Sequence, residues 1–144
     1  MREIKFRGKT VEGAKLWKYG SFLAPSNAAC KPLIYERFSK PMHDGNGYWY
    51  EVDESTVGQF TGLRDSDGRE IYEGDVLEYK TWAETGERYV TMGEVRFLQG
   101  QFLVVGPKDI EVQGLFSVAH EPALSDVLVV GNVHDNSGLL EQKP

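Results

Sequence analysis

Glycines and turn-forming pairs divide this chain into stretches too short for helices of ordinary length. Sixteen glycines occur in 144 residues, and pairs such as Asp67-Gly68, Glu73-Gly74 and Gln99-Gly100 are turn signals. Between the turns, apolar residues alternate with polar ones, which is the period of a half-buried strand. No segment longer than about two turns carries the apolar stripe of a helix. The pattern predicts an all-β fold with little helix, built from one or two small barrels rather than a parallel sheet.

The first 23 residues are predicted to form an opening β-hairpin. In residues 3–7, apolar and charged side chains alternate, and an aromatic strand follows over residues 16–23. This alternation places Phe6 toward the core and turns Lys5 and Arg7 toward solvent.

The same alternation places Lys18 opposite its two aromatic neighbours on the second strand. Trp17 and Tyr19 are then expected in the core, as is Phe97 further along the chain. The fold prediction therefore depends on the sheets burying these aromatic side chains.

The next segment is the least regular. Three prolines and several turn signals interrupt residues 24–46, which leave a short strand candidate at residues 33–35. A better strand, residues 48–52, follows the Gly-Asn-Gly turn. One helical turn is possible at residues 122–126, and a final short helix is possible near residues 135–140.

The second half of the chain predicts further strands and one cross-strand pairing. Val95 and Phe97 are expected to face Phe102 and Val104 across the Gln-Gly turn, which makes a compatible set. Residues 127–133 form an unbroken apolar run, which predicts a central buried strand.

Composition limits the functional classes. The formal net charge of −6 argues against a general polyanion binder, which needs a positive surface. Cys30 is the only cysteine, so no internal disulfide forms and a reducing cytoplasm is the expected compartment. No apolar run follows the charged first residues, so we expect no signal peptide, and no run is long enough to predict a membrane span.

Charge is unevenly distributed along the chain. Residues 1–40 hold nine Lys or Arg against three Asp or Glu, a net of +6, whereas the rest hold seven against nineteen, a net of −12. Two solvated faces explain this, but so does a basic region that contacts an acidic subunit, partner protein or nucleic acid. The candidate binding residues are the basic side chains of the first hairpin: Arg2, Lys5, Arg7, Lys9, Lys15 and Lys18. Aromatic residues between them could stack bases, although such residues usually pack in the core.

No metal or cofactor site is predicted. Asp65, Asp67 and Gly68 resemble part of a calcium loop, but the register puts Leu63 and Gly74 at two ligand positions, so a hairpin turn is favoured. Cysteine and histidines are too scattered for a zinc site, and no glycine pattern matches a phosphate-binding loop.

No catalytic residues are predicted either. The neighbouring carboxylates of residues 70–78 are interpreted as solvated strand and turn acids. His134-Asp135 with the nearby Ser137 does not define a triad, because adjacency in sequence says nothing about geometry. An unrecognised enzyme remains an alternative.

Several blocks of the sequence stand out, at residues 1–7, 57–65, 67–76, 130–136 and 139–140. Together these blocks resemble the YopX family of phage and prophage proteins. The resemblance implies a mostly β protein with a C-terminal half similar to SH3-like barrels, an oligomer in some members, and a bacterial host cytoplasm. It supplies no catalytic motif, and the blocks themselves indicate turns and hence folding.

These observations predict an N-terminal β subdomain with an irregular loop (residues 1–56), an SH3-like barrel (57–140) and a flexible tail (141–144). The expected function is that of a non-enzymatic accessory protein without cofactor, which forms a homo-oligomer or binds a host or phage protein. The alternative is a nucleic-acid-binding module that uses the basic hairpin.

Overall fold

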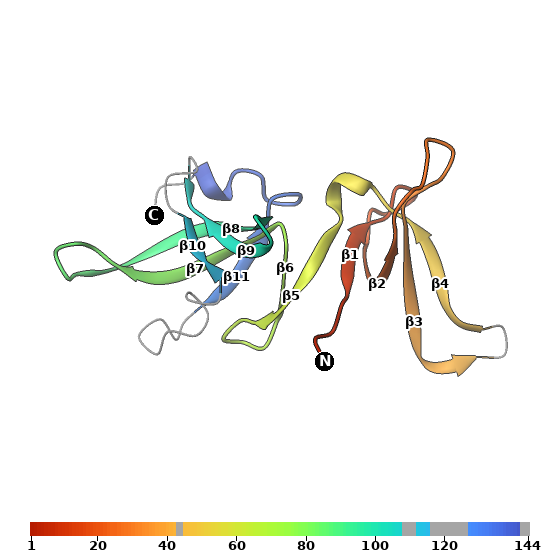
Figure 1. The fold of residues 1–144 in the computed structure, drawn as a ribbon, viewed down its shortest axis with the longest axis horizontal. Coiled ribbons are helices and arrows are strands. Elements are labelled where there is room, and N and C mark those ends of the chain that lie inside the picture. The colour runs from red at the N-terminus through yellow and green to blue at the C-terminus, as the bar shows by residue number, and fades with distance from the viewer. Residues whose placement is uncertain (43–44, 108–111, 116–126, 142–144) are drawn as a thin grey trace. The chain divides into compact units, whose positions relative to one another are not determined.

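The computed structural model describes residues 1–42, 45–107, 112–115 and 127–141. The chain divides into two compact units, Met1–Phe60 and Thr61–Pro144 (Figure 1). The division falls inside one strand, a few residues after the boundary expected between residues 56 and 57. Both units are built from antiparallel strands and contain little helix in the described part, which confirms the all-β prediction.

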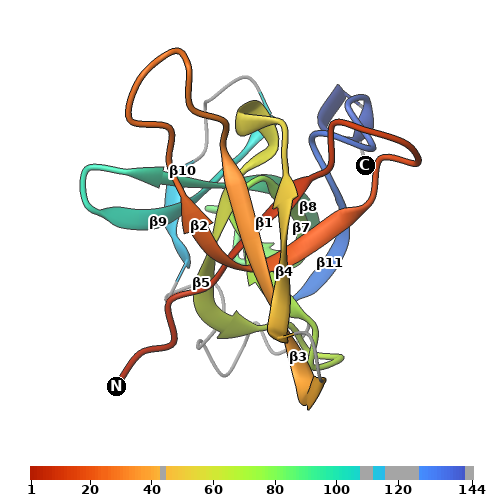
Figure 2. The same cartoon turned by 90° about the vertical axis from the view of Figure 1, so that its right-hand side faces the viewer.

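The first unit is a curved antiparallel sheet. Its elements are β1 (Phe6–Lys9), β2 (Trp17–Leu23), β3 (Leu33–Met42), β4 (Gly45–Glu51), a 3-10 turn (Glu54–Thr56) and the beginning of β5 (Gly58–Arg64). The strand order is β4-β3-β2-β1-β5, and Figure 2 shows these strands facing the viewer. The predicted opening hairpin is therefore present as β1 and β2.

Backbone bonds draw the two sides of this sheet together at one end. Thr10 bridges Val52, the Asp53 N–H donates to the Lys9 carbonyl at 2.8 Å, and the Val11 N–H donates to the Glu51 carbonyl at 3.3 Å. Val52 thus lies on Gly8, where an added methyl group would come within 3.1 Å of the valine side chain. β1 itself runs from Phe6 to Lys9, later than the strand predicted over residues 3–7.

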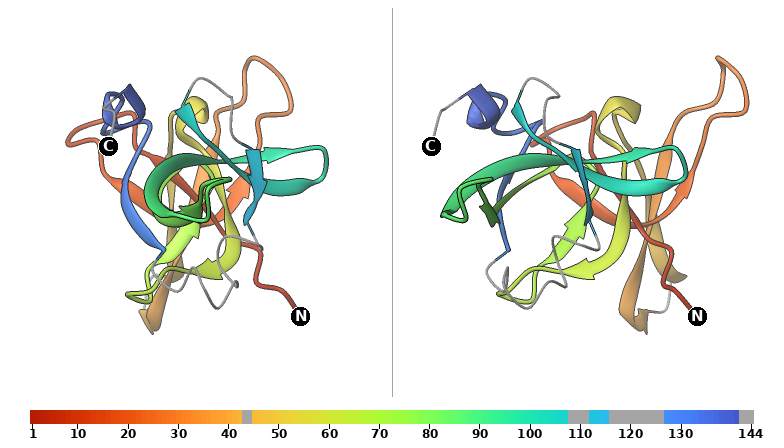
Figure 3. Two further views of the ribbon diagram at one scale, coloured as in Figure 1. Left: turned by 90° about the vertical axis from the view of Figure 1, so that its left-hand side faces the viewer. Right: turned by 60° about the vertical axis from the view of Figure 1, so that its left-hand side comes forward.

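The second unit contains a five-stranded antiparallel sheet, shown at two angles in Figure 3. Its elements after β5 are β6 (Glu70–Tyr72), β7 (Asp75–Trp82), β8 (Arg88–Leu98), β9 (Gln101–Val105), β10 (Val112–Gly114), β11 (Leu128–Asn132) and a 3-10 turn (Leu139–Glu141). The order of the five strands is β10-β9-β8-β7-β11, while β5 continues into this unit next to β6.

One apolar cluster forms the core of the second unit. It comprises the buried side chains of Ile71, Leu77, Tyr79, Val95, Val104, Leu115 and Val127. Burying each such side chain contributes roughly 1.5–3 kcal/mol from apolar area alone. The cluster joins strands from β6 to the start of β11, so one core stabilises the whole unit.

The predicted turns of the second unit are confirmed. Gly68, Gly74 and Gly100 have φ of 83°, 85° and 81°, which side chains with a Cβ rarely adopt. The cross-strand prediction is also correct, because Val95 pairs with Val104 and Phe97 with Phe102.

The expectation that Phe97 lies in the core is wrong. Its ring packs on that of Phe102, 5.0 Å away between centroids, yet the residue is 46% exposed. Val95 is fully buried two positions earlier, so the strand keeps its inward face. Phe97 lies one residue before the turn between β8 and β9, at the end of the strand, where the described core residues no longer cover the inward face of β8.

The apolar run at residues 127–133 does not form the predicted central strand. β11 is the last strand in the sheet order and pairs with β7. The register shifts between Val129 and Gly131, so the intervening Val130 is a bulge residue and is exposed. A continuous apolar run does not distinguish such an edge strand from a central one.

Two further expectations differ in extent. The short strand predicted at residues 33–35 is the start of the ten-residue β3, which continues through Pro41. The final short helix is a single 3-10 turn. The helical turn predicted at residues 122–126 and most of the predicted tail lie outside the described residues.

Candidate functional site

Three of the six basic residues singled out in the sequence share one face of the first strand. Lys5, Arg7 and Lys9 alternate along the chain, and Lys9 lies directly across from Trp17 on β2. The guanidinium carbon of Arg7 lies 4.6 Å from the Trp17 ring centroid, and Lys9 Nζ lies 5.7 Å from it. Two cations therefore lie over one indole, a cation–π arrangement.

Arg7 does not face solvent, contrary to the sequence expectation. It is 6% exposed, whereas Phe6 is only half-buried. Strand pairing sets Arg7 across from Tyr19, and the guanidinium of Arg7 lies over the ring of Trp17. Strand alternation correctly separates Arg7 from Phe6, but it does not say which face is covered.

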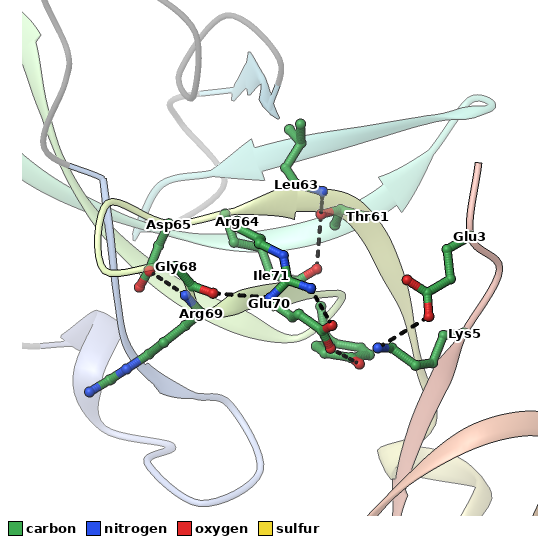
Figure 4. A network of polar contacts seen from close by, with 11 residues as sticks. Glu3, Lys5, Thr61, Leu63, Arg64, Asp65, Gly68, Arg69, Glu70 and Ile71 are labelled. Carbon is green, nitrogen blue, oxygen red and sulfur yellow. Dashed lines mark hydrogen bonds and ion pairs between the residues drawn. The ribbon is translucent and has the colours of Figure 1, made fainter. Parts of the chain in front are cut away.

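Lys5 lies over another aromatic ring of the same unit. Its ammonium is 5.2 Å from the centroid of the Phe60 ring and 3.4 Å from the carboxylate of Glu3. The ion pair with Glu3 is drawn in Figure 4. The charge of Lys5 is thus partly neutralised by a residue of the same segment, just before β1.

Lys18 lies on the opposite face of the sheet, across from Gly8. Its ammonium donates to Glu36 at 3.1 Å and lies 4.1 Å from the Tyr50 ring centroid. The hydrogen bond to the Glu36 carboxylate raises the pKa of Lys18 above its ordinary value. Lys18 is therefore part of the packing between β2, β3 and β4.

The six predicted residues do not form one continuous basic surface. Arg2 precedes β1 and Lys15 lies in the loop between β1 and β2, and both are exposed. The structure gathers Lys5, Arg7 and Lys9, places Lys18 on the other face, and engages all four in contacts within the unit.

Sequence reasoning missed an aromatic surface on the face that Arg7 and Lys9 occupy. Successive strand pairs place Ser21, Tyr35 and Trp49 side by side across β2, β3 and β4. The rings of Tyr35 and Trp49 are 4.9 Å apart. We call Tyr19, Leu23, Tyr35 and Trp49 the aromatic face, since alternation puts them on one side of the sheet.

Most of this face is open. Tyr19 is 41% exposed and Trp49 is 54% exposed, so the expectation that Tyr19 lies in the core is wrong. Tyr48, which points to the other side, is also exposed, and its ring contacts Phe38 at 4.8 Å. The sequence does carry a signal, because three consecutive aromatic residues on a strand must occupy both of its faces.

In the second unit, a buried carboxylate organises the hairpin between β5 and β6. Oδ1 of Asp65 accepts the N–H groups of Asp67 and Arg69 at 3.0 and 2.8 Å, and Oδ2 accepts that of Val129 at 3.0 Å. Figure 4 shows the turn, in which Arg64 also reaches the Gly68 carbonyl and the Glu70 carboxylate. Asp65 therefore fixes the turn and attaches it to β11.

A second set of bonds connects the turn after β6 with the segment after β11. The Val133 N–H donates to the Gly74 carbonyl at 2.9 Å. Oδ1 of Asn132 accepts the N–H groups of His134 and Asp135 at 3.0 and 2.9 Å. These side chains hold backbone in place, which agrees with the interpretation of the blocks as folding elements.

The family model described as YopX protein matches residues 5–141. The chain belongs to the YopX family. The match covers both units, including the turns built on Asp65 and Gly74. It indicates a shared fold and gives no named activity.

A solved structure resembles this YopX-family chain over almost its full length. The crystal structure of protein EF1440 from Enterococcus faecalis superposes with a TM-score of 0.58 and 23% identity, covering 97% of this chain and 99% of that one. At this identity the likeness shows the fold. No curated protein matches the chain. In the described part, none of the helical segments has the length and apolar character needed to cross a membrane.

Proposed function

We propose that this protein is a non-catalytic phage or prophage accessory protein that acts in the bacterial cytoplasm by self-association. The observation that carries the proposal is the exposure of Tyr19 and Trp49 on the aromatic face. Large aromatic side chains on a rigid sheet are typical anchors of protein interfaces, because they bury much area at a small entropic cost. A second protein that covers this face is the related possibility.

The state of the basic residues supports a protein partner. Arg7 is buried against Trp17, and Lys18 is bonded to Glu36. Such cations add less to phosphate binding than exposed ones would, because moving them toward a phosphate breaks contacts within the unit. Burial of apolar area does not depend on free cations, so association through the aromatic face should persist at high salt.

Light scattering and sedimentation across a range of protein concentrations test the proposal. We expect an oligomer whose dissociation constant changes little between low and high salt. Trp49→Ser should weaken association by about tenfold or more, as expected for an interface anchor. Phe97→Ser is the matched control, since it removes an equally exposed aromatic residue from the second unit. A monomer at every concentration, or equal effects of Trp49→Ser and Phe97→Ser, would refute it.

Nucleic-acid binding is the second candidate, and the shared face of Lys5, Arg7, Lys9 and Trp17 favours it. Labelled single- and double-stranded DNA and RNA, titrated at about 100 mM salt, provide the test. Binding that weakens with salt and is lost in Arg2→Glu with Lys15→Glu would support this candidate. These positions are suitable because both side chains are exposed and reversal leaves the core contacts intact.

A further inference from the structure

The outer edge of β4 differs from the other sheet edges in the described part of the chain. β4 stands at the end of its sheet order, and its residues 45–50 include no charged side chain and no proline. By comparison, β10 has three residues and β11 contains a bulge. Short edges and bulges discourage pairing with another chain, whereas an uncharged edge of this length invites it.

Hydrogen-bond parity identifies which backbone groups of β4 point outward. The Val52 N–H donates to the Pro32 carbonyl, so this opposed pair is a hydrogen-bonded one. Alternation along an antiparallel ladder then directs the backbone N–H and C=O groups of Tyr50 and Tyr48 toward β3. The backbone groups of Glu51, Trp49 and Gly47 point away from β3. The Glu51 carbonyl agrees, because it accepts from the Val11 N–H outside the ladder.

We propose that β4 pairs with β4 of a second copy of this chain, antiparallel and with a two-fold axis at Tyr48. In this register Gly47 lies opposite Trp49 of the second copy, and the reverse. Their outward N–H and C=O groups form the hydrogen-bonded pairs, which continue the sheet across the axis. The proposal rests on the proposed function, since it specifies how the first unit would self-associate.

Other registers with the same parity fit less well. An axis at Trp49 would place Gly47 opposite Glu51, whose carbonyl already accepts from Val11. An axis at Gly47 would place Trp49 opposite Gly45, which pairs with Met42 after a register irregularity in β3. The axis at Tyr48 centres the pairing on Gly47 and Trp49, whose outward backbone groups take part in none of these bonds.

Side chains complement this register. Gly47 has no side chain, and an added methyl group there would lie 2.8 Å from Cζ of Tyr35. An indole that arrives opposite Gly47 therefore meets the Tyr35 ring of the other copy. The Tyr35–Trp49 pair, with centroids 4.9 Å apart, would grow into a cluster of four rings. Tyr48 would face its own symmetry mate on the other side of the sheet.

Cysteine cross-linking tests the register in a background in which the exposed Cys30 is replaced by serine. Tyr48→Cys should form a disulfide-linked dimer under mild oxidation, because a non-hydrogen-bonded pair brings two Cα atoms to about 4.5 Å, within disulfide reach. Asn46→Cys is the matched control. Asn46 is also exposed, but in this register it lies opposite Tyr50 of the second copy and not opposite the second Asn46. We expect Tyr48→Cys to cross-link at least about tenfold faster than the control.

Amide exchange provides a readout without substitution. The N–H groups of Gly47 and Trp49 should gain protection when the protein concentration rises through the association range. Edge pairing is wrong if light scattering shows an oligomer while Tyr48→Cys cross-links no faster than Asn46→Cys and these amides gain no protection. The proposal of self-association would still hold in that case. If the protein is monomeric throughout, both the edge pairing and the proposed function fail.

Discussion

The two units differ in how many apolar side chains they bury. Among the described residues, the first unit buries the apolar side chains of Ile34, Val52 and Phe60, whereas the second unit buries ten apolar side chains. The first unit supplements its small core with cations packed on aromatic rings, and it leaves other aromatic residues exposed. A unit of about 60 residues buries a smaller share of its surface than a larger one, so such supplements matter. The second unit therefore relies on a buried apolar core, whereas the first unit leaves large aromatic side chains exposed for contact with a partner.

Loss of the Asp65 carboxylate should produce the largest effect and should affect the second unit. Asp65→Ala leaves three N–H donors in a buried turn without their acceptor, which costs about 4 kcal/mol. Denaturant unfolding measures the loss, and hydrogen exchange should locate it in residues 61–141. Asp67→Ala, at an exposed position in the same turn, should cost less than about 0.5 kcal/mol. Equal effects would mean that the carboxylate is not the organising group.

A backbone collision should produce the next largest effect, now in the first unit. Gly20 has φ of 155°, and a methyl group there would collide with the carbonyl oxygen of Tyr35. Gly20→Ala should therefore destabilise the β2–β3 pairing by about 3 kcal/mol. Gly13→Ala is the control, because Gly13 has φ of 66° with open space around it. It should cost only about 1 kcal/mol, as strain without collision.

Removing one buried cation measures how much the first unit relies on its aromatic contacts. Arg7→Met keeps an apolar stem but removes the guanidinium over Trp17. We expect a loss of about 1–2 kcal/mol in denaturant unfolding. Lys15→Met changes an exposed loop lysine and should leave stability unchanged within about 0.5 kcal/mol. If Arg7→Met is also neutral, the first unit does not depend on this stacking.

The smallest expected effect is a pH dependence from Lys18. Glu36 raises the pKa of Lys18 in the folded state, so the pair's contribution is fully present below the unfolded pKa and is lost as pH rises through the folded pKa. Stability should therefore fall as pH rises past about 10.5, the ordinary value for lysine. Glu36→Gln should remove this part of the slope, which amounts to less than about 1 kcal/mol. Parallel slopes for the two proteins would exclude the pair as its source.

Local signals in the sequence predicted the elements and most turns of this fold. Gly68 and Gly74 require positive φ at the tight turns where they were expected, and alternation predicted the Val95–Val104 pairing. These features depend on neighbours in the chain, and a single sequence displays them directly. The family resemblance, confirmed over residues 5–141, rests on the same turn-forming blocks.

Properties that depend on distant partners were not predictable. Alternation separates the side chains of Arg7 and Phe6, but only the arrival of Trp17 across the hairpin decides that Arg7 is covered. Likewise, Tyr19 and Phe97 are exposed because no described layer covers them, which no local pattern reveals. The sequence therefore identified the basic residues of the candidate site, but not which of them are buried or paired. It did not identify the exposed Trp49.

The strand that spans both units has a consequence for synthesis of the chain. β1 pairs with β5 through Phe6–Gln59 and Arg7–Gly58, and the Lys9 N–H donates to the hydroxyl of Thr56, 47 residues later. While the ribosome is still translating that interval, the N-terminal strand has no partner on its β5 side. The sheet of the first unit is therefore incomplete during that time and its aromatic side chains are uncovered, which makes the nascent chain a candidate substrate of chaperones.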